Sequence, residues 1–584
     1  MDQTDWKNVV CMVADDEDDN RHLIDAENLE KVIAAEDRNI FVSKIYLDAY
    51  KQVTTSTEQS YPDATYAINR QINSGCLIFN YTGHGNENGL AAERVVKAED
   101  ISSWSNANRL PLFIMATCEF SRFDDADKNA ITQTMIERKS AGEKVLLKEN
   151  GGAIALMSTT RVALSSLNYN LNKNIFGFAF DKDSEGRSMR LGDIIRLAKV
   201  NTGNDTNKRG FALLGDPALR IALPDDGRAI TDSINHKCVV YETIDTLKAL
   251  SVVTISGHIE KNSGVPFNEF NGFLSPVVYD KPSTVLTLGN DGEATVSFQK
   301  MDNIIFKGNC EVRDGKFEFS FLVPREINYE YGNGKIIYYA YDGENDIAGS
   351  FDEIIVGGFS PIVKIDTVGP EIKLFMNDTL FRDGGITGPM PVLLAQLEDP
   401  SGINSSGFAI GHDIVAEIDN DPEQTFVLNN YFETDRNNYT RGSINYQLMG
   451  LSDGRHTLTL KAWDSLNNSN RQSITFFVKT DEGFLTNNPR NYPNPATSHT
   501  KFTLEHNRPG ELMYVTIRIF NGAGKLIKTI ETETFSQGYQ LPDIEWDCRN
   551  SNGQSVARGI YIYIMDIETE SGEKARESGR IIIL

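Results

Sequence analysis

The pattern of apolar residues changes near Pro224, and this change restricts the chain to a multidomain fold of two kinds. Before this proline, short apolar runs alternate with stretches whose apolar residues follow a helical period. After it, apolar residues recur at every second position in short segments separated by Gly, Asn and Asp. The first pattern is typical of a mostly parallel α/β sheet covered by helices, and the second of several all-β, immunoglobulin-like sandwiches.

The first part of the chain predicts alternating strands and helices. We expect strands near 9–14, 40–47, 76–81, 110–116 and 152–157, and helices near 23–35, 64–72, 130–138, 167–180 and 191–200. Linker-like segments near 363–370 and 480–491 divide the β-rich remainder. The predicted domains are 1–223, 224–360, 361–482 and 483–584.

Composition excludes several classes of protein. The 584 residues include 57 Lys+Arg and 82 Asp+Glu, a formal net charge of −25, so nucleic acid is not an expected partner. The six cysteines form no CxxC pair, which argues against a disulfide scaffold or a structural zinc site. No apolar run is long enough to span a membrane, and the polar N-terminus is unlike a signal peptide. We expect this chain to be a fragment of a longer protein.

Two predicted strands end in residues that can perform chemistry. His84 and Gly85 follow one apolar run, and Cys118 follows another. In parallel sheets, ligands bind beyond the carboxyl ends of the strands, where a thiol could attack a carbonyl and an imidazole could protonate the leaving amine. The backbone N–H groups of Gly85 and Cys118 are candidates for the oxyanion hole. Taken singly, each residue also fits a structural reading, a buried thiol or a turn histidine.

These motifs resemble the gingipain branch of the caspase-like cysteine peptidases. The resemblance covers about residues 6–223. It rests on Asn80–Gly85, on 110–113 leading into Ala116–Cys118, on Gly215–Leu219, and on segments 151–155 and 158–160. It implies a cysteine endopeptidase whose catalytic residues are His84, Cys118 and an acidic residue after the first strand.

The position of that acid is ambiguous within the sequence. Asp16 is the best positional match for the residue that orients His84, and Asp15 and Glu17 are the alternatives. The same acidic stretch could instead be a solvated loop or a cation site.

The resemblance also implies a substrate pocket bordered by Leu23, Thr159 and Thr160. Leu23 stands where arginine-specific relatives carry an aspartate, so no strict requirement for arginine is expected. Asp25 and Glu27 are the alternative pocket acids.

The last hundred residues resemble the C-terminal sorting domain of type IX secretion cargo. The resemblance rests on Tyr492–Pro495, on Asn521–Lys525, on Trp546-Asp547 and on 557–561. Together with the peptidase motifs, it resembles the sortases of the type IX secretion system, which cleave sorting domains from cargo at the bacterial cell surface.

That resemblance implies partners and a location. The expected partners are protein substrates with C-terminal sorting domains, an outer-membrane β-barrel protein and a lipopolysaccharide amine as acceptor. The expected location is the cell surface, associated with the outer membrane. No required cofactor and no metal are expected, and a structural Ca²⁺ stays open without a complete motif. A degradative gingipain-like protease and a non-catalytic surface adhesin are the competing functions.

Overall fold

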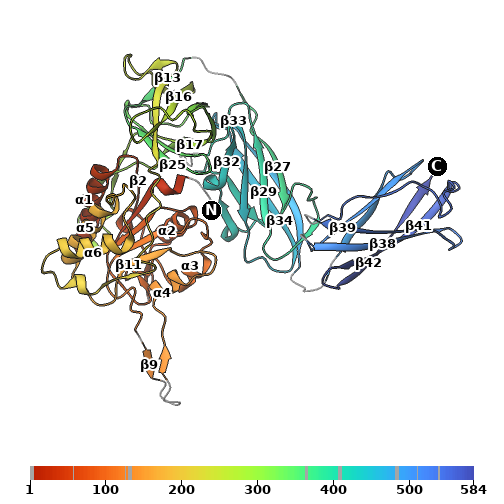
Figure 1. Ribbon diagram of the computed structural model, residues 1–584, viewed down its shortest axis with the longest axis horizontal. Coiled ribbons are helices and arrows are strands. Elements are labelled where there is room, and N and C mark those ends of the chain that lie inside the picture. Colours follow the sequence, from red (N-terminus) through yellow and green to blue (C-terminus); the bar gives the residue numbers. More distant parts are fainter. Residues whose placement is uncertain are drawn as a thin grey trace. The chain divides into compact units, whose positions relative to one another are not determined.

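The computed structural model describes residues 5–56, 58–124, 126–128, 135–361, 366–405, 411–479, 484, 486–508, 511–536 and 540–584 (Figure 1). The chain divides into two units. One consists of residues 1–364 with 436–438, and the other of 365–435 with 439–584.

The first unit begins with a six-stranded sheet in the order β12-β11-β8-β5-β1-β2. Its strands are β1 (Val9–Ala14), β2 (Phe41–Tyr46), β5 (Ile78–Thr82), β8 (Leu112–Ala116), β11 (Ala155–Thr159) and β12 (Phe211–Leu214). All neighbours run parallel except β11 and β12, which are antiparallel. The predicted mostly parallel sheet is confirmed.

Helices cover both faces of this sheet (Figure 1). They are α1 (Arg21–Glu36), α2 (Pro62–Ser74), α3 (Ala98–Ser103), α4 (Ala141–Leu146), α5 (Ser165–Ala179) and α6 (Leu191–Asn201). Alternate residues of β1 point to opposite faces. Val10 and Met12 pack in the core with α1, α5 and α6, whereas Cys11 and Val13 pack in the core with α2, α3 and α4. Because both faces are buried, the strands read as continuous apolar runs.

One predicted helix is wrong. Within the expected helix 130–138, the structure has the strand β10 (Met135–Glu137), which pairs antiparallel with β9 (Ala126–Lys128). Residues 129–134 lie outside the described residues. A helical period over so few positions does not separate a helix from a strand, and here the backbone hydrogen bonds between β9 and β10 decide.

An all-β region completes the first unit. Its largest sheet contains β13 (Gly227–Ile234), β14 (Lys237–Cys238), β16 (Val252–Lys261), β17 (Gly272–Tyr279), β20 (Ile304–Lys307), β21 (Cys310–Arg313), β22 (Lys316–Leu322), β24 (Lys335–Tyr341) and β25 (Asp346–Phe351). Smaller sheets contain β15 (Thr246–Ala249), β23 (Gly332–Asn333) and β26 (Ile355–Phe359), and β18 (Ser283–Leu286) with β19 (Ser297–Lys300).

Contacts join this all-β region to the α/β sheet. Asn8 Nδ2 donates to the carbonyl oxygen of Tyr338 at 2.7 Å, and Lys7 pairs with Asp346 at 2.6 Å. Phe298 is buried in the same core as residues of α1. The two regions therefore share part of one hydrophobic core.

The second unit is built from strands with alternating burial. Its first sheets contain β27 (Glu371–Met376), β29 (Val392–Glu398), β32 (Phe432–Asp435) and β33 (Asn438–Gln447), and β28 (Gly385–Thr387), β30 (Val415–Ile418), β31 (Thr425–Val427), β34 (Gly454–Trp463) and β35 (Ser469–Val478). Its last sheets contain β36 (Thr486–Tyr492), β37 (Thr500–His506) and β40 (Ile544–Trp546), and β38 (Glu511–Asn521), β39 (Leu526–Ser536), β41 (Gly559–Thr569) and β42 (Lys574–Ile583). Each pair of sheets encloses its own hydrophobic core, as expected for β-sandwiches.

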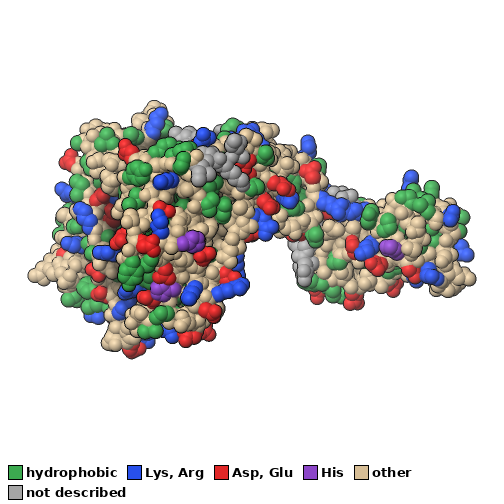
Figure 2. Space-filling view, turned by 90° about the horizontal axis from the view of Figure 1, so that it is seen from above, with side chains coloured by type: hydrophobic (Ala, Val, Ile, Leu, Met, Phe, Trp, Pro, Cys, Tyr) green, Lys and Arg blue, Asp and Glu red, His purple; other side chains and the backbone are tan. Residues whose placement is uncertain are grey.

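Charged groups of both signs are mixed over the face shown in Figure 2, and no single-signed area dominates it. None of the helices in the described part of the chain has the length and apolar character that a membrane crossing requires.

Candidate active site

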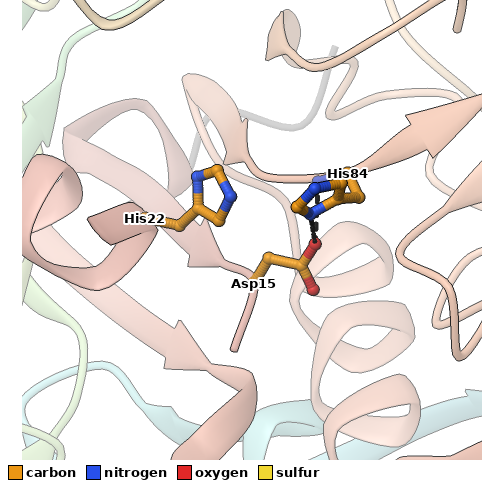
Figure 3. A group of neighbouring side chains, drawn as sticks. All are labelled: Asp15, His22 and His84. Carbon is orange, nitrogen blue, oxygen red and sulfur yellow. Dashed lines mark hydrogen bonds and ion pairs between the residues drawn. The ribbon is translucent and has the colours of Figure 1, made fainter. Parts of the chain in front are cut away.

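The histidine and a carboxylate meet at the ends of two neighbouring strands (Figure 3). Asp15 follows β1 directly, and His84 lies two residues beyond β5, its parallel partner. The Oδ2 atom of Asp15 accepts a hydrogen bond from the backbone N–H of His84 at 2.7 Å and lies 3.2 Å from the ring atom Nδ1. Asp15 is buried, whereas the side chain of His84 is 42% exposed. The carboxylate therefore fixes both the backbone and the ring of a histidine that substrate can reach.

Gly83 allows this close approach. A Cβ atom at Gly83 would lie 2.4 Å from the Cβ of Asp15, a separation that carbon atoms do not tolerate. Glycine is therefore required where the loop after β5 passes over the end of β1.

The contact predicted for Asp16 belongs to Asp15, one of the two alternatives. Asp16 Oδ2 instead accepts a hydrogen bond from the hydroxyl of Tyr61. Successive side chains at a strand end point in opposite directions, so only one of the two adjacent aspartates can face His84. Glu17, the other alternative, is partly exposed, and its Oε2 atom lies 3.1 Å from Nδ1 of His84.

The acidic surroundings favour the protonated imidazole of His84. Its pKa is raised to about 9, first by the hydrogen bond to Asp15 and further by the charges of Asp15, Glu17 and Asp18, against the opposing effect of partial burial. At neutral pH the ring therefore carries a proton that it can donate to a leaving amine.

Cys118 lies at the end of the next strand. Thr82 of β5 pairs with Ala116 of β8, so His84 and Cys118 each stand two residues beyond a paired position. The Sγ atom lies 3.4 Å from both the backbone nitrogen and the backbone oxygen of Ala163. Because adjacent strands are about 4.8 Å apart, the structure brings the thiol and the imidazole to one edge of the sheet.

Gly85, the candidate oxyanion-hole residue, approaches the segment that leads into Cys118. It begins β6 (Gly85–Asn86), which pairs with β7 (Gly89–Leu90). A Cβ atom at Gly85 would lie 2.6 Å from Oγ1 of Thr117. Gly85 therefore lies close to the side chain of Thr117, the residue that precedes Cys118.

The three predicted pocket residues differ in exposure. Leu23 is only 4% exposed and packs in the hydrophobic core with α5, so it does not line an open pocket in this structure. It lies on the core-facing side of α1, which explains the difference. Thr159 is buried and donates to the carbonyl oxygen of Thr117 at 2.6 Å, which supports the backbone before Cys118. Thr160 is partly exposed and donates to the carbonyl oxygen of Gly210 at 3.0 Å.

The two alternative pocket acids have different surroundings. Glu27 pairs with Lys44 at 2.7 Å and accepts a hydrogen bond from Tyr46 at 2.8 Å. Asp25 is partly buried, and burial raises its pKa to about 6.

Buried carboxylates lie behind Asp15. One oxygen of each of Asp15, Asp16 and Glu93 lies within 4.8 Å of the others. Asp16 Oδ1 and Glu93 Oε2 are buried without a hydrogen-bond partner. Burial raises the pKa of both Asp16 and Glu93 to about 7, with a further contribution from the charge of Asp15. The sequence contains no signal for Glu93, because the contact depends on a turn far from the first strand.

His22 was also missed as a member of this site. It is 2% exposed, and its ring centroid lies 5.3 Å from that of His84, with the rings nearly perpendicular (Figure 3). Burial lowers the pKa of His22, so its ring is neutral near pH 7.

The cluster of Asp15, Asp16 and Glu93 is one group of side chains in the described ranges that could hold a cation, and there are two others. The first is Asp15, His22 and His84, and the second is Asp366, Asp399 and Asp464 in the second unit.

A strand-end thiol beside a strand-end histidine that is oriented by a buried carboxylate is the arrangement of a cysteine peptidase. Comparison of the sequence with protein families gives the same class of protein. Residues 1–222 match peptidase family C25, and residues 490–583 match the secretion system C-terminal sorting domain. The first domain is therefore a gingipain-family cysteine peptidase domain, and the last is a sorting domain.

Solved structures of similar proteins include dimeric latent PorU from Porphyromonas gingivalis. It is 26% identical, with 86% of this chain and 46% of that chain covered and a TM-score of 0.31. The Arg-specific cysteine proteinase gingipain R is 13% identical, with 60% and 67% covered and a TM-score of 0.31. This chain thus spans about half the length of the PorU chain. No curated protein matches it.

Proposed function

We propose that this protein is a cysteine endopeptidase and transpeptidase that acts as a type IX secretion sortase, removing C-terminal sorting domains from secreted cargo. The hydrogen bonds of His84 to Asp15, at a sheet edge shared with Cys118, carry the peptidase part of the proposal. The sorting domain at residues 490–583 of the same chain supports a place in that secretion system, at the cell surface.

The thiolate of Cys118 attacks the carbonyl carbon of the scissile bond. The N–H groups of Gly85 and Cys118 stabilise the oxyanion that forms, and His84 gives its proton to the leaving amine as the C–N bond breaks. The product is a thioester between cargo and Cys118. Water hydrolyses this thioester, or an amine on surface lipopolysaccharide attacks it and forms a new amide, and either step releases the thiol.

Incubation with a cargo protein that carries a sorting domain tests the proposal. Mass spectrometry of the cargo should show a new C-terminus before the sorting domain, and a mass increase when an amine acceptor is present. Cys118→Ala should abolish both products and leave the thermal unfolding curve close to that of the parent. Cleavage by a folded Cys118→Ala protein would rule out the assignment of the nucleophile.

A secreted degradative peptidase is the second candidate. The sorting domain supports this alternative as well, because secreted cargo carries such a domain. A peptide library separates the two functions. Cleavage of many unrelated peptides at rates similar to that of the cargo junction would favour the degradative peptidase, whereas preference for the junction would favour the sortase.

A further inference from the structure

The buried imidazole of His22 lies beside His84 but takes no part in the peptidase steps. It is the second residue of α1, and neither of its ring nitrogens has a hydrogen-bond partner. Burial of an imidazole without such partners is unfavourable, because both nitrogens lose their bonds to water. A ligand that binds one of these nitrogens would remove part of this cost.

Asp18 lies close to both histidines. Its Oδ2 atom is 3.5 Å from Nε2 of His22 and 3.8 Å from Nε2 of His84. These distances are too long for good hydrogen bonds. They are close to the edge of a tetrahedral zinc centre, because metal–ligand distances of about 2.0–2.1 Å place the ligand atoms about 3.3 Å apart.

Asp15 contacts His84 on the side of the ring opposite Nε2. Its contact with Nδ1 of His84 leaves Nε2 of that ring available to a metal, which is the usual role of a carboxylate behind a metal-binding histidine. One oxygen of Asp15 and one nitrogen of each histidine lie within 4.8 Å of one another. Figure 3 shows the two imidazoles on either side of the Asp15 side chain.

The backbone holds Asp18 in place for this role. Asp18, Asp19 and Asn20 all have positive φ angles, between 54° and 66°, which Asp and Asn tolerate better than other non-glycine residues. The carboxylate of Glu293 fixes this turn by accepting hydrogen bonds from the N–H groups of Asp19 at 2.9 Å and Asn20 at 2.8 Å. These two hydrogen bonds stabilise the turn without any ligand.

We propose that His22, His84 and Asp18 form an inhibitory site for Zn²⁺, with Asp15 orienting His84. Two imidazoles and one carboxylate form a donor set that zinc accepts, with the fourth position left to water. Ca²⁺ and Mg²⁺ prefer all-oxygen sites and should bind poorly here. The side chains of His84 and Asp18 are 42% and 45% exposed, so the ion can enter from solvent.

Zinc at this site would stop proton transfer by His84. The ion takes the lone pair of Nε2, the proton displaced from the ring passes to solvent, and the ring can no longer protonate a leaving amine. This inhibition rests on the proposed peptidase function, whereas zinc binding itself does not. The two parts can therefore be tested separately.

Binding is measured by calorimetry with ZnCl₂ and the full chain carrying Cys118→Ala, which removes the thiol as a ligand. We expect His22→Leu in this background to lower the affinity at least tenfold. Asp18→Asn should also lower it, and because Asp18 is exposed this second variant does not depend on repacking of the core. His258→Gln is the control, because His258 also contacts two carboxylates, those of Asp232 and Glu260, and should leave the affinity unchanged.

The site is excluded if zinc binds equally well with and without His22, or if Cys118→Ala alone abolishes binding. The second result would assign the metal to the thiol. Peptide cleavage by the chain with Cys118 intact then tests the inhibition, with each variant compared with its own rate in the absence of metal. Micromolar ZnCl₂ should inhibit the parent, and His22→Leu should raise the inhibitory concentration at least tenfold, while millimolar CaCl₂ has no such effect. Binding as expected in a chain that cleaves nothing would support the zinc site and overturn the proposed function.

Discussion

Asp15 and Asp16 are adjacent residues with different partners, and this difference makes them a matched pair. Asp15 holds the backbone and ring of His84, whereas Asp16 accepts a hydrogen bond from Tyr61. Asparagine at either position keeps the size of the side chain and removes its charge. The two substitutions should therefore differ in their effect on the pKa of His84.

Asp15→Asn should lower kcat/KM at least tenfold and move the alkaline limb of its pH profile to lower pH. The hydrogen bond to Asp15 is the main cause of the raised pKa of His84, about 9, so its loss lets the catalytic proton leave at lower pH. Asp16→Asn should leave the limb near pH 9, because the amide oxygen can still accept from Tyr61. A pH profile that moves with Asp16→Asn and stays fixed with Asp15→Asn would contradict this assignment.

Glu93 should make the protein less stable as the pH rises. Its pKa is about 7 in the folded protein against an ordinary value near 4.5, so the folded state binds the proton more tightly than the unfolded state does. The unfolding free energy therefore falls between about pH 4.5 and pH 7. Glu93→Gln removes this loss, and its stability relative to the parent should rise by about 3 kcal/mol across that interval.

Thermal unfolding at pH 5 and pH 8 measures this change. Glu99→Gln, in an exposed side chain of the nearby helix α3, is the matched control. An equal response of the two variants would show that burial of Glu93 is not its cause.

At the scale of elements, the site depends on how tightly the ends of β1, β5 and β8 approach each other. Gly83→Ala should destabilise the first unit by about 1–3 kcal/mol, because the new methyl group would overlap Asp15 and force the strand ends apart. It should also lower kcat/KM by displacing His84.

Gly177→Ala is the control for Gly83→Ala. Gly177 lies inside α5, and apart from its chain neighbours and the backbone of α5 no atom lies within 4 Å of the position of an added Cβ. Alanine there should stabilise the helix by up to about 1 kcal/mol. Thermal unfolding and peptide cleavage measure both variants, and a Gly83→Ala protein as stable and active as the parent would show that the loop relaxes freely.

The strand ends could be predicted from the sequence because each buried parallel strand is a short apolar run with a visible limit. His84 and Cys118 follow directly from those limits. The choice between Asp15 and Asp16 could not be made in this way, because a shift of one residue exchanges the face to which a side chain points. The positions of His22 and Glu93 in the site could not be predicted from the sequence, because their surroundings depend on tertiary packing. The pairing of β9 with β10 was not predicted, because the period of apolar residues is ambiguous over so few positions.

At the scale of the whole molecule, the sorting domain should be dispensable for chemistry. Its core, from Ala496 to Ile583, consists only of its own residues. Removal of residues 483–584 should leave cleavage of a short soluble peptide within about twofold of that of the parent and should reduce retention at the cell surface. Peptide cleavage and cell fractionation measure the two effects, and a folded truncated chain without cleavage would contradict this division of roles.

Removal of the all-β region that follows the peptidase domain should have the opposite result. A chain that ends at residue 223 loses Glu293, which holds the turn at Asp19 and Asn20, and loses Phe298 from the shared core. We expect it to be poorly folded and inactive, whereas a chain that ends at residue 361 should cleave peptide. Cleavage and thermal unfolding of the two chains provide the test, and full activity of the shorter chain would show that these contacts are unnecessary.

The hydrogen bonds of Glu293 also affect how such a protein can change by recombination. A gene fusion made at the border between the α/β fold and the all-β region would separate the turn at Asp19 and Asn20 from Glu293, which holds it. The segment that must stay intact in such a fusion is therefore longer than the peptidase domain. Transfer of the peptidase domain into another protein should give a folded product when the all-β region is transferred with it. Substitutions in the all-β region should be tolerated where they leave Glu293 and its neighbours in place.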